Sequence, residues 1–298
     1  MRERFGYASE KKSNEENRFL ISALEKMEKN KDRLNEIDMN KFREMYTDKF
    51  VDIDLEYIKD KEEEFEEEAL PSKKEAENRG KIMEALTILN LPLWMGENVT
   101  ARKASRFDDI RNKIDAVVEI DQETSREVMA LAVDVTHVSG LERGVDRLGK
   151  NLEKKLRSIK KEIDNGRLGT IKYFESGDGT FQGKLSQIPR VVVGIDTKTL
   201  REIVEIWLGD REEEMKNHPV AFQIIEEIEM QLETFLAYAR EIKQTKVQKA
   251  LERQLKILQK IREDKMENLD ETKSNFEYRE KDRAFKELKL GMGNFRNL

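Results

Sequence analysis

The sequence contains no cysteine, only two histidines and four prolines among its 298 residues. The absence of cysteine excludes disulfides, thiol catalysis, thiolate-bound zinc and iron–sulfur clusters. With only His137 and His218, a multi-histidine metal site is not expected, so any metal would be held by oxygen ligands, which suit magnesium, manganese or calcium. No apolar run is long enough to span a bilayer, and the chain begins Met1-Arg2-Glu3-Arg4. We therefore expect a cytoplasmic protein that makes no membrane contact.

Charged residues, in contrast to cysteine, histidine and proline, are abundant in this sequence. Charged residues make up 40% of the chain and hydrophobic residues 37%, against about 25% and 45–50% in typical globular proteins. This composition predicts charged, exposed helices around a core of limited size. The formal net charge is −6, which argues against a general coat protein for nucleic acid, although local segments differ in sign.

Three regions follow from the pattern of apolar residues. Residues 1–70 predict a charged helical arm, and the stretch 52–68 contains ten acids and two lysines. Residues 72–210 predict an α/β core, because the apolar period changes several times between helix and strand. Residues 211–298 predict long helices with one apolar stripe, and a homodimer through these helices is a further expectation.

The core region alternates between the two kinds of element. Helices are predicted over 75–90, 141–164 and 199–208, and strands over 113–120, 128–136, 170–174 and 190–195. A glycine-rich loop with Gly177, Gly179 and Gly183 separates the last two strands. The order α-β-β-α-β-β-α is that of a mixed α/β domain.

The first two predicted strands carry acidic residues toward one face. If the chain turns between residues 124 and 125, Asp115 lies opposite Asp134. Because side chains alternate across a strand, one face is apolar and the other presents Asp115, Glu119, Asp134 and Thr136 among small residues. Opposed Cβ atoms lie roughly 5 Å apart, where like charges destabilise a sheet. We expect Mg²⁺ or Mn²⁺ between the two aspartates, and an ordinary solvated sheet face is the alternative.

Positive charge surrounds these acids in the sequence. Residues 141–172 contain ten lysines or arginines against five acids, and residues 101–114 contain five against two. A divalent ion between carboxylates can activate water and bind a phosphate oxygen, and a positive rim fits a nucleic-acid phosphate better than a small sugar. A solvated helix of mixed charge is the alternative. The predicted nucleic-acid contacts are Arg143, Arg147, Lys150, Lys154 and Lys155.

The order of these features resembles the PD-(D/E)XK nuclease superfamily. A helix with Glu84 is followed by Asp115 on one strand, by Asp134-Val135-Thr136 on the next, and then by a basic helix and two strands. The chain is also similar, over residues 72–240, to a group of uncharacterised bacterial proteins. That similarity is carried by three segments: 76–81, 106–110 and 131–136. The resemblance implies a restriction-endonuclease-like mixed sheet core with long charged helical extensions at both ends.

The resemblance also implies a divalent-metal-dependent nuclease, with DNA favoured over RNA as substrate. The implied metal ligands are Glu84, Asp115 and Asp134. The superfamily's motif lysine, which orients or activates water, is replaced here by Thr136. Either a lysine of the following helix, such as Lys150 or Lys154, supplies that group, or the site is weakened or inactive. The catalytic candidates are Asp115, Asp134, Thr136 and Lys154. The alternative function is an inactive nuclease-like fold that binds nucleic acid or acts in assembly.

Overall fold

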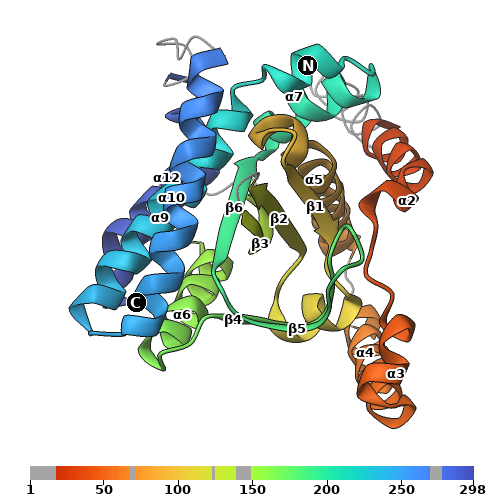
Figure 1. Ribbon diagram of the computed structural model, residues 1–298. Coiled ribbons are helices and arrows are strands. Elements are labelled where there is room, and N and C mark those ends of the chain that lie inside the picture. Colours follow the sequence, from red (N-terminus) through yellow and green to blue (C-terminus); the bar gives the residue numbers. More distant parts are fainter. Residues whose placement is uncertain (1–17, 68–70, 123–124, 139–148, 269–276) are drawn as a thin grey trace, which may run out of the picture.

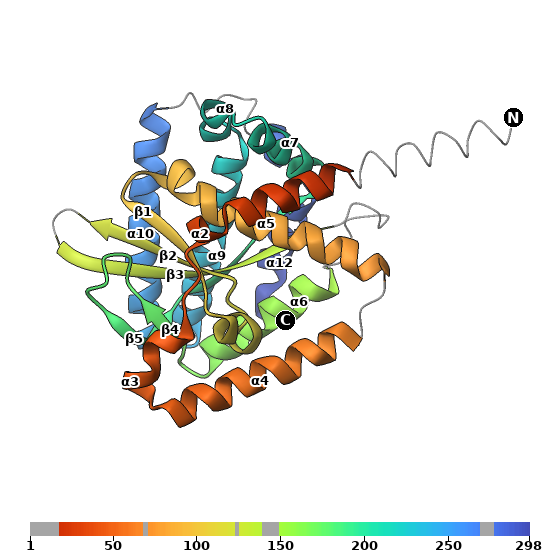
Figure 2. The same ribbon diagram turned by 90° about the vertical axis from the view of Figure 1, so that its right-hand side faces the viewer.

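The computed structural model describes the backbone of residues 18–67, 71–122, 125–138, 149–268 and 277–298, with side chains for all of these except 71–73, 122, 125–138 and 266–268. The described elements form a mixed α/β fold, as the sequence predicted (Figures 1 and 2). Within this described part, no helix has the length and apolar character needed to span a membrane.

Helices lie on both sides of a central sheet. On the N-terminal side, residues 18–29 are helical and are followed by α2 (Lys31–Leu34), η1 (Met39–Phe42), α3 (Arg43–Tyr46), α4 (Asp48–Glu67) and α5 (Pro71–Met95). The later helices are η2 (Asp108–Asn112), α6 (Lys150–Asp164), α7 (Thr197–Leu208), α8 (Glu212–Lys216), α9 (Val220–Glu241), α10 (Thr245–Asn268), α12 (Arg283–Asn294) and η3 (Phe295–Asn297). Figure 1 shows α9, α10 and α12 along one flank of the molecule and α2 to α4 along the other.

The central sheet has the strand order β1 (Val99–Lys103), β2 (Ala116–Gln122), β3 (Ser125–Val138), β6 (Arg190–Asp196). The β1–β2 and β2–β3 pairs are antiparallel. β3 and β6 are parallel, which requires a long crossover, and α6 lies within that crossover. A separate antiparallel pair is formed by β4 (Gly169–Glu175) and β5 (Gln182–Ile188). The four predicted strands are present, and β1 and β5 are strands that the sequence analysis did not predict.

The two faces of β2 are both packed. Ala116 lies in an apolar cluster with Ala85 of α5, whereas the neighbouring Val117 packs with Phe174 of β4. Val117 is completely buried, and Glu119, on the same face, is 5% exposed. The solvated acidic face considered as an alternative is therefore wrong at these positions, because the β4–β5 pair covers them.

The outer edge of β6 is hydrogen-bonded by side chains of α9. The Gln231 side chain accepts from the Val192 N–H and donates to the Val192 carbonyl, both at 2.8 Å. One helical turn earlier, Glu227 accepts from the Gly194 N–H at 3.0 Å, and Gln223 donates to the Gly194 carbonyl at 3.3 Å. Residues four apart share one helix face, so the three side chains form a row. This row satisfies backbone groups that an edge strand would otherwise expose.

The C-terminal helices use their apolar stripe inside the chain. α9 and α10 pack against each other, and α12 packs on α9 and β6. Phe235 of α9 and Leu251 and Leu258 of α10 are almost completely buried in the main core. The apolar stripe that suggested a homodimer is therefore buried within the chain. The homodimer stays a prediction, but this stripe no longer supports it.

The N-terminal helices are anchored to the core by a lysine of β4. The Lys172 ammonium group contacts the Asp54 carboxylate of α4 and lies 4.9 Å from the centre of the Phe107 ring and 5.2 Å from that of Tyr173. The Tyr46 hydroxyl donates to the Lys172 carbonyl at 2.8 Å. The described part of the predicted arm therefore packs against the α/β core.

Candidate active site and nucleic-acid interface

The β2–β3 ladder has the predicted register. Ala116 pairs with Val133, and the ladder continues to Ile120 with Met129 before it shifts near the turn. The next residues beyond the Ala116–Val133 pair are Asp115 and Asp134. Asp134 lies on β3, whereas Asp115 is the residue before β2 and is partly exposed. The predicted strand over 113–120 thus begins only at Ala116, and the Asp115–Asp134 pair lies one residue beyond the observed ladder.

Asp134 and Thr136 lie on β3 between β2 and β6. In the parallel ladder Asp134 pairs with Val192 and Thr136 with Gly194. The side chains of Asp134 and Thr136 are outside the described part of the chain. Their proposed chemistry therefore depends on the strand register and stays a prediction.

Glu84 of α5 forms an ion pair with Lys103, the last residue of β1, at 3.2 Å. Burial raises the pKa of Glu84, and the attraction of Lys103 opposes that rise. For Lys103, burial lowers the pKa, but the charges of Glu84 and Glu36 outweigh this effect and leave it above its ordinary value. Lys103 is therefore a permanent cation. Sequence reasoning missed it because β1 was not predicted.

The Glu84–Lys103 pair lies on the α5 face of the sheet. Lys103 pairs with Ala116, which packs against α5. The residues around Asp115, by contrast, include Ile114 and Val117, which pack on the β4–β5 face. Among the described side chains no group of three or more His, Asp or Glu could hold a metal ion. Asp134 is not one of those side chains, so the predicted ligand set is untested.

Helix α6 presents part of the predicted basic surface. The helix begins at Lys150 and buries Leu152, Leu156, Ile159 and Ile163 against the core. Lys150 and Lys154 are exposed, and Lys155 is half-buried. Arg143 and Arg147, which were predicted on the same helix, lie outside the described residues.

A basic cavity of about 360 Å³ lies at the N-terminal end of β2, and we refer to it below as the basic cavity. It is formed where η2, the second half of α6 and the starts of β4 and β6 meet. Glu162 is its one acidic lining residue. The basic side chains among its lining residues are Arg111, Lys113, Lys161, Arg167 and Arg190.

Arg190 forms the buried part of this cavity and is only 3% exposed. Its guanidinium group donates to the Asn112 carbonyl at 3.0 Å and to the Ser158 hydroxyl at 2.8 Å, and it pairs with Glu162 at 3.2 Å. Burial raises the pKa of Glu162, and Arg190 opposes that rise. The other four basic side chains are exposed, so they are available to an anion.

The position of the cavity is fixed by the turn that precedes β2. The Asp108 carboxylate accepts hydrogen bonds from the backbone N–H groups of Lys172 and Tyr173, at 2.8 and 3.0 Å, and from the Asn112 amide at 2.6 Å. Lys113 then adopts a left-handed conformation, with φ of 58°, and ends η2. This arrangement places Lys113 in the cavity two residues before Asp115.

Comparisons with family models, with curated proteins and with solved structures gave no match to this chain.

Proposed function

We propose that the chain is a divalent-metal-dependent nuclease that hydrolyses phosphodiester bonds, with DNA as the favoured substrate, on a restriction-endonuclease-like core. The observation that supports the proposal is the β2–β3 register, which, if it continued one residue beyond the Ala116–Val133 pair, would bring Asp115 opposite Asp134. The element order supports it as well. Helix α5 precedes the antiparallel strands, and α6 precedes the strand that pairs in parallel with β3.

The donor set fits a hard cation. Asp115 and Asp134 supply carboxylate oxygens, which are the ligands that Mg²⁺ and Mn²⁺ prefer. The bound ion would supply a more acidic water and a Lewis acid for a phosphate oxygen. A bound cation would also relieve the repulsion between the two carboxylates if they lie opposite each other. The second carboxylate would therefore contribute to the site as a metal ligand.

The basic cavity supports a polyanionic substrate. Its exposed cations, Lys113 among them, begin two residues from Asp115. Phosphate contacts of this kind position a nucleic acid without reading its sequence, and each contact adds to the salt dependence of binding. A cleavage site next to such contacts would receive the backbone of the strand rather than a base.

Cleavage assays with the full chain test the proposal. Plasmid DNA, single-stranded DNA and RNA are incubated with Mg²⁺ or Mn²⁺, and Asp115→Asn and Asp134→Asn are compared with wild type. We expect metal-dependent cleavage that falls by about a hundredfold or more in either variant, since each removes a charged ligand. Glu56→Gln, an exposed position on α4, is the matched control. Wild-type protein that leaves all three substrates intact, or cleavage that survives Asp115→Asn, would remove the nuclease assignment.

One observation favours the alternative, an inactive nuclease-like module that binds nucleic acid. Glu84, the implied third ligand, is paired with Lys103 on the α5 face, and position 136 is a threonine. Glu84→Gln separates the two functions. Loss of cleavage with an unchanged melting temperature supports a metal ligand. A lower melting temperature with binding retained supports a structural ion pair, because Lys103 would lose its buried partner.

A further inference from the structure

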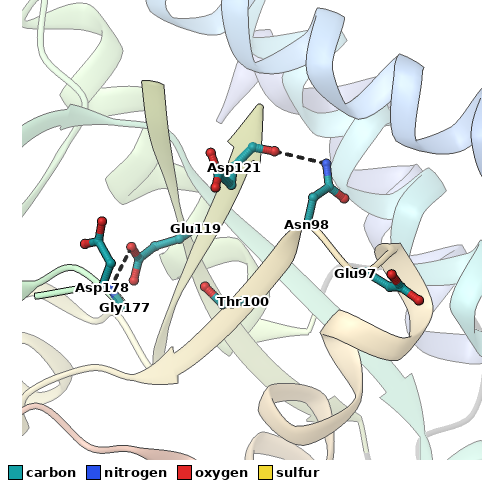
Figure 3. Close-up of a pocket in the computed structure, with 7 residues that line it drawn as sticks. All are labelled: Glu97, Asn98, Thr100, Glu119, Asp121, Gly177 and Asp178. Carbon is teal, nitrogen blue, oxygen red and sulfur yellow. Dashed lines mark hydrogen bonds between the residues drawn. The ribbon is translucent and has the colours of Figure 1, made fainter. Parts of the chain in front are cut away.

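A second cavity, the acidic cavity, lies at the C-terminal end of β2 (Figure 3). Its volume is about 300 Å³. Four separate segments form it: the α5–β1 connection, β1, β2 and the β4–β5 turn. The lining residues include four carboxylates and no lysine or arginine. They are Glu97, Asn98, Thr100, Glu119, Asp121, Gly177 and Asp178.

Glu119 is the buried group of this cavity. The residue is 5% exposed, and its Oε2 accepts a hydrogen bond from the Gly177 N–H at 3.1 Å. Its Oε1 is buried and has no hydrogen-bond partner among the described residues. Arg102 of β1 acts on Glu119 through its charge, but its guanidinium group donates to the Glu175 carbonyl. A buried carboxylate oxygen without a partner is costly, and a bound hydrogen-bond donor would remove that cost.

Asp178 adds a carboxylate that stays ionised. Its Oδ1 accepts from the Ser176 hydroxyl at 2.7 Å, and from the N–H and hydroxyl of Thr180 at 3.0 and 2.8 Å. These hydrogen bonds lower the pKa of Asp178 to about 2. The turn thus fixes a negative charge beside Glu119, and Figure 3 shows the two side chains next to each other.

The carboxylates are spread along the cavity. Figure 3 shows Glu119 and Asp178 toward one end, Glu97 at the other, and Asp121 between them. Within the described part of the chain they do not form a group of three or more acids that could hold a metal ion. Negative charges spread over several positions of the cavity suit a cation with a positive group at each end.

We propose that the acidic cavity binds a short linear aliphatic diamine. One ammonium group donates to Oε1 of Glu119 and lies beside Asp178, the methylene chain passes Thr100 and Asp121, and the second ammonium group lies near Glu97. Binding is non-covalent and does not depend on the nuclease proposal.

Calorimetric titration of the full chain with putrescine, without nucleic acid, tests this site. We expect saturable binding of one diamine per chain. Glu119→Gln, which is nearly isosteric and neutral, should weaken it by about tenfold to a hundredfold, because a charge-assisted hydrogen bond is lost. n-Butylamine, with the same carbon chain and one amino group, should bind at least about tenfold more weakly than putrescine.

A second variant, Glu97→Gln, tests the same site in case Glu119→Gln does not fold. Glu97→Gln, at an exposed position, should weaken putrescine binding and leave n-butylamine binding unchanged, since the monoamine needs only the Glu119 end. Glu56→Gln on α4 is the matched control. Three results would overturn the proposal: no saturable binding at millimolar putrescine, equal affinity for the two amines, or displacement of putrescine by equimolar Ca²⁺ or Mg²⁺.

Discussion

The two cavities lie at opposite ends of the same strands and have opposite charge. β2 and β4 both begin at the basic cavity and end at the acidic cavity. Each cavity has one buried charged residue, Arg190 or Glu119. The guanidinium of Arg190 has three protein oxygens within reach, although its Nε has no partner among the described residues. Glu119 accepts from the Gly177 N–H through Oε2, and its Oε1 has no partner among the described residues. The buried charge of the basic cavity is thus matched mainly by protein groups, whereas our proposal for the acidic cavity is that a bound donor matches its buried charge.

Removal of divalent metal gives the largest contrast between the two ends. We expect EDTA to reduce nucleic-acid cleavage to background, because the Asp115 and Asp134 carboxylates alone cannot activate water. Putrescine binding, measured by calorimetry in the same buffer, should not change. Asp115→Asn should in addition raise the Mg²⁺ concentration needed for half-maximal cleavage by about tenfold, since one charged ligand is lost. Loss of putrescine binding in EDTA would show that the two sites share a metal and would break the comparison.

A single cation of the basic cavity should have a smaller effect. Arg167→Ala removes an exposed guanidinium from its lining. We expect DNA affinity to fall by about fivefold near 0.1 M salt, and the slope of log affinity against log salt to decrease by about one. Fluorescence anisotropy with a labelled duplex at several salt concentrations measures both quantities.

The control for Arg167→Ala is Lys198→Ala, an exposed lysine of α7, which follows the C-terminal end of β6, whereas the basic cavity lies at the start of β6. It should leave the slope unchanged. An equal decrease in slope for both variants would mean that binding follows the overall charge of the protein rather than the basic cavity.

The features at the start of β2 could be predicted from the sequence better than those at its end. The register of β2 and β3 followed from alternation in two neighbouring segments, because a slip of one residue would move every apolar side chain to the wrong face. The basic cavity was partly foreseen, since Lys113, Lys161 and Arg167 fall in the basic segments of the sequence. These signals are local in the chain.

The acidic cavity could not be predicted in the same way. Its lining residues come from four segments, and two of these, β1 and the turn before β5, belong to or adjoin strands that are too polar to be recognised from pattern alone. β1 has a single large aliphatic residue, Val99, and became identifiable only through its pairing with β2. The cover that β4–β5 places over Val117 and Glu119 is likewise a tertiary effect. Strand propensity depends strongly on such context.

The smallest expected effect concerns the pH dependence of stability that comes from Glu119, the buried charge of the acidic cavity. Burial raises the pKa of Glu119. The Gly177 hydrogen bond and the charge of Arg102 oppose this rise, and Asp178 adds to it. The folded chain therefore holds the Glu119 proton more tightly than the unfolded chain, in which a glutamate titrates near about 4.3. The stability contributed by protonated Glu119 is complete below that pH and is lost as the pH rises through the folded-state pKa.

Thermal unfolding of wild type and Glu119→Gln between pH 4 and pH 8 measures this contribution. Glutamine does not ionise, so the variant should melt about 2 °C higher than wild type at pH 7 and at the same temperature at pH 4. Glu56→Gln removes one exposed charge and should shift the curve by the same small amount at every pH in this range. Burial also raises the pKa of Glu162 in the basic cavity, but wild type and Glu119→Gln share that residue, so its contribution cancels in their difference. A constant difference between wild type and Glu119→Gln would mean that the pKa of Glu119 is the same in the folded and unfolded chains, and therefore that burial does not raise it.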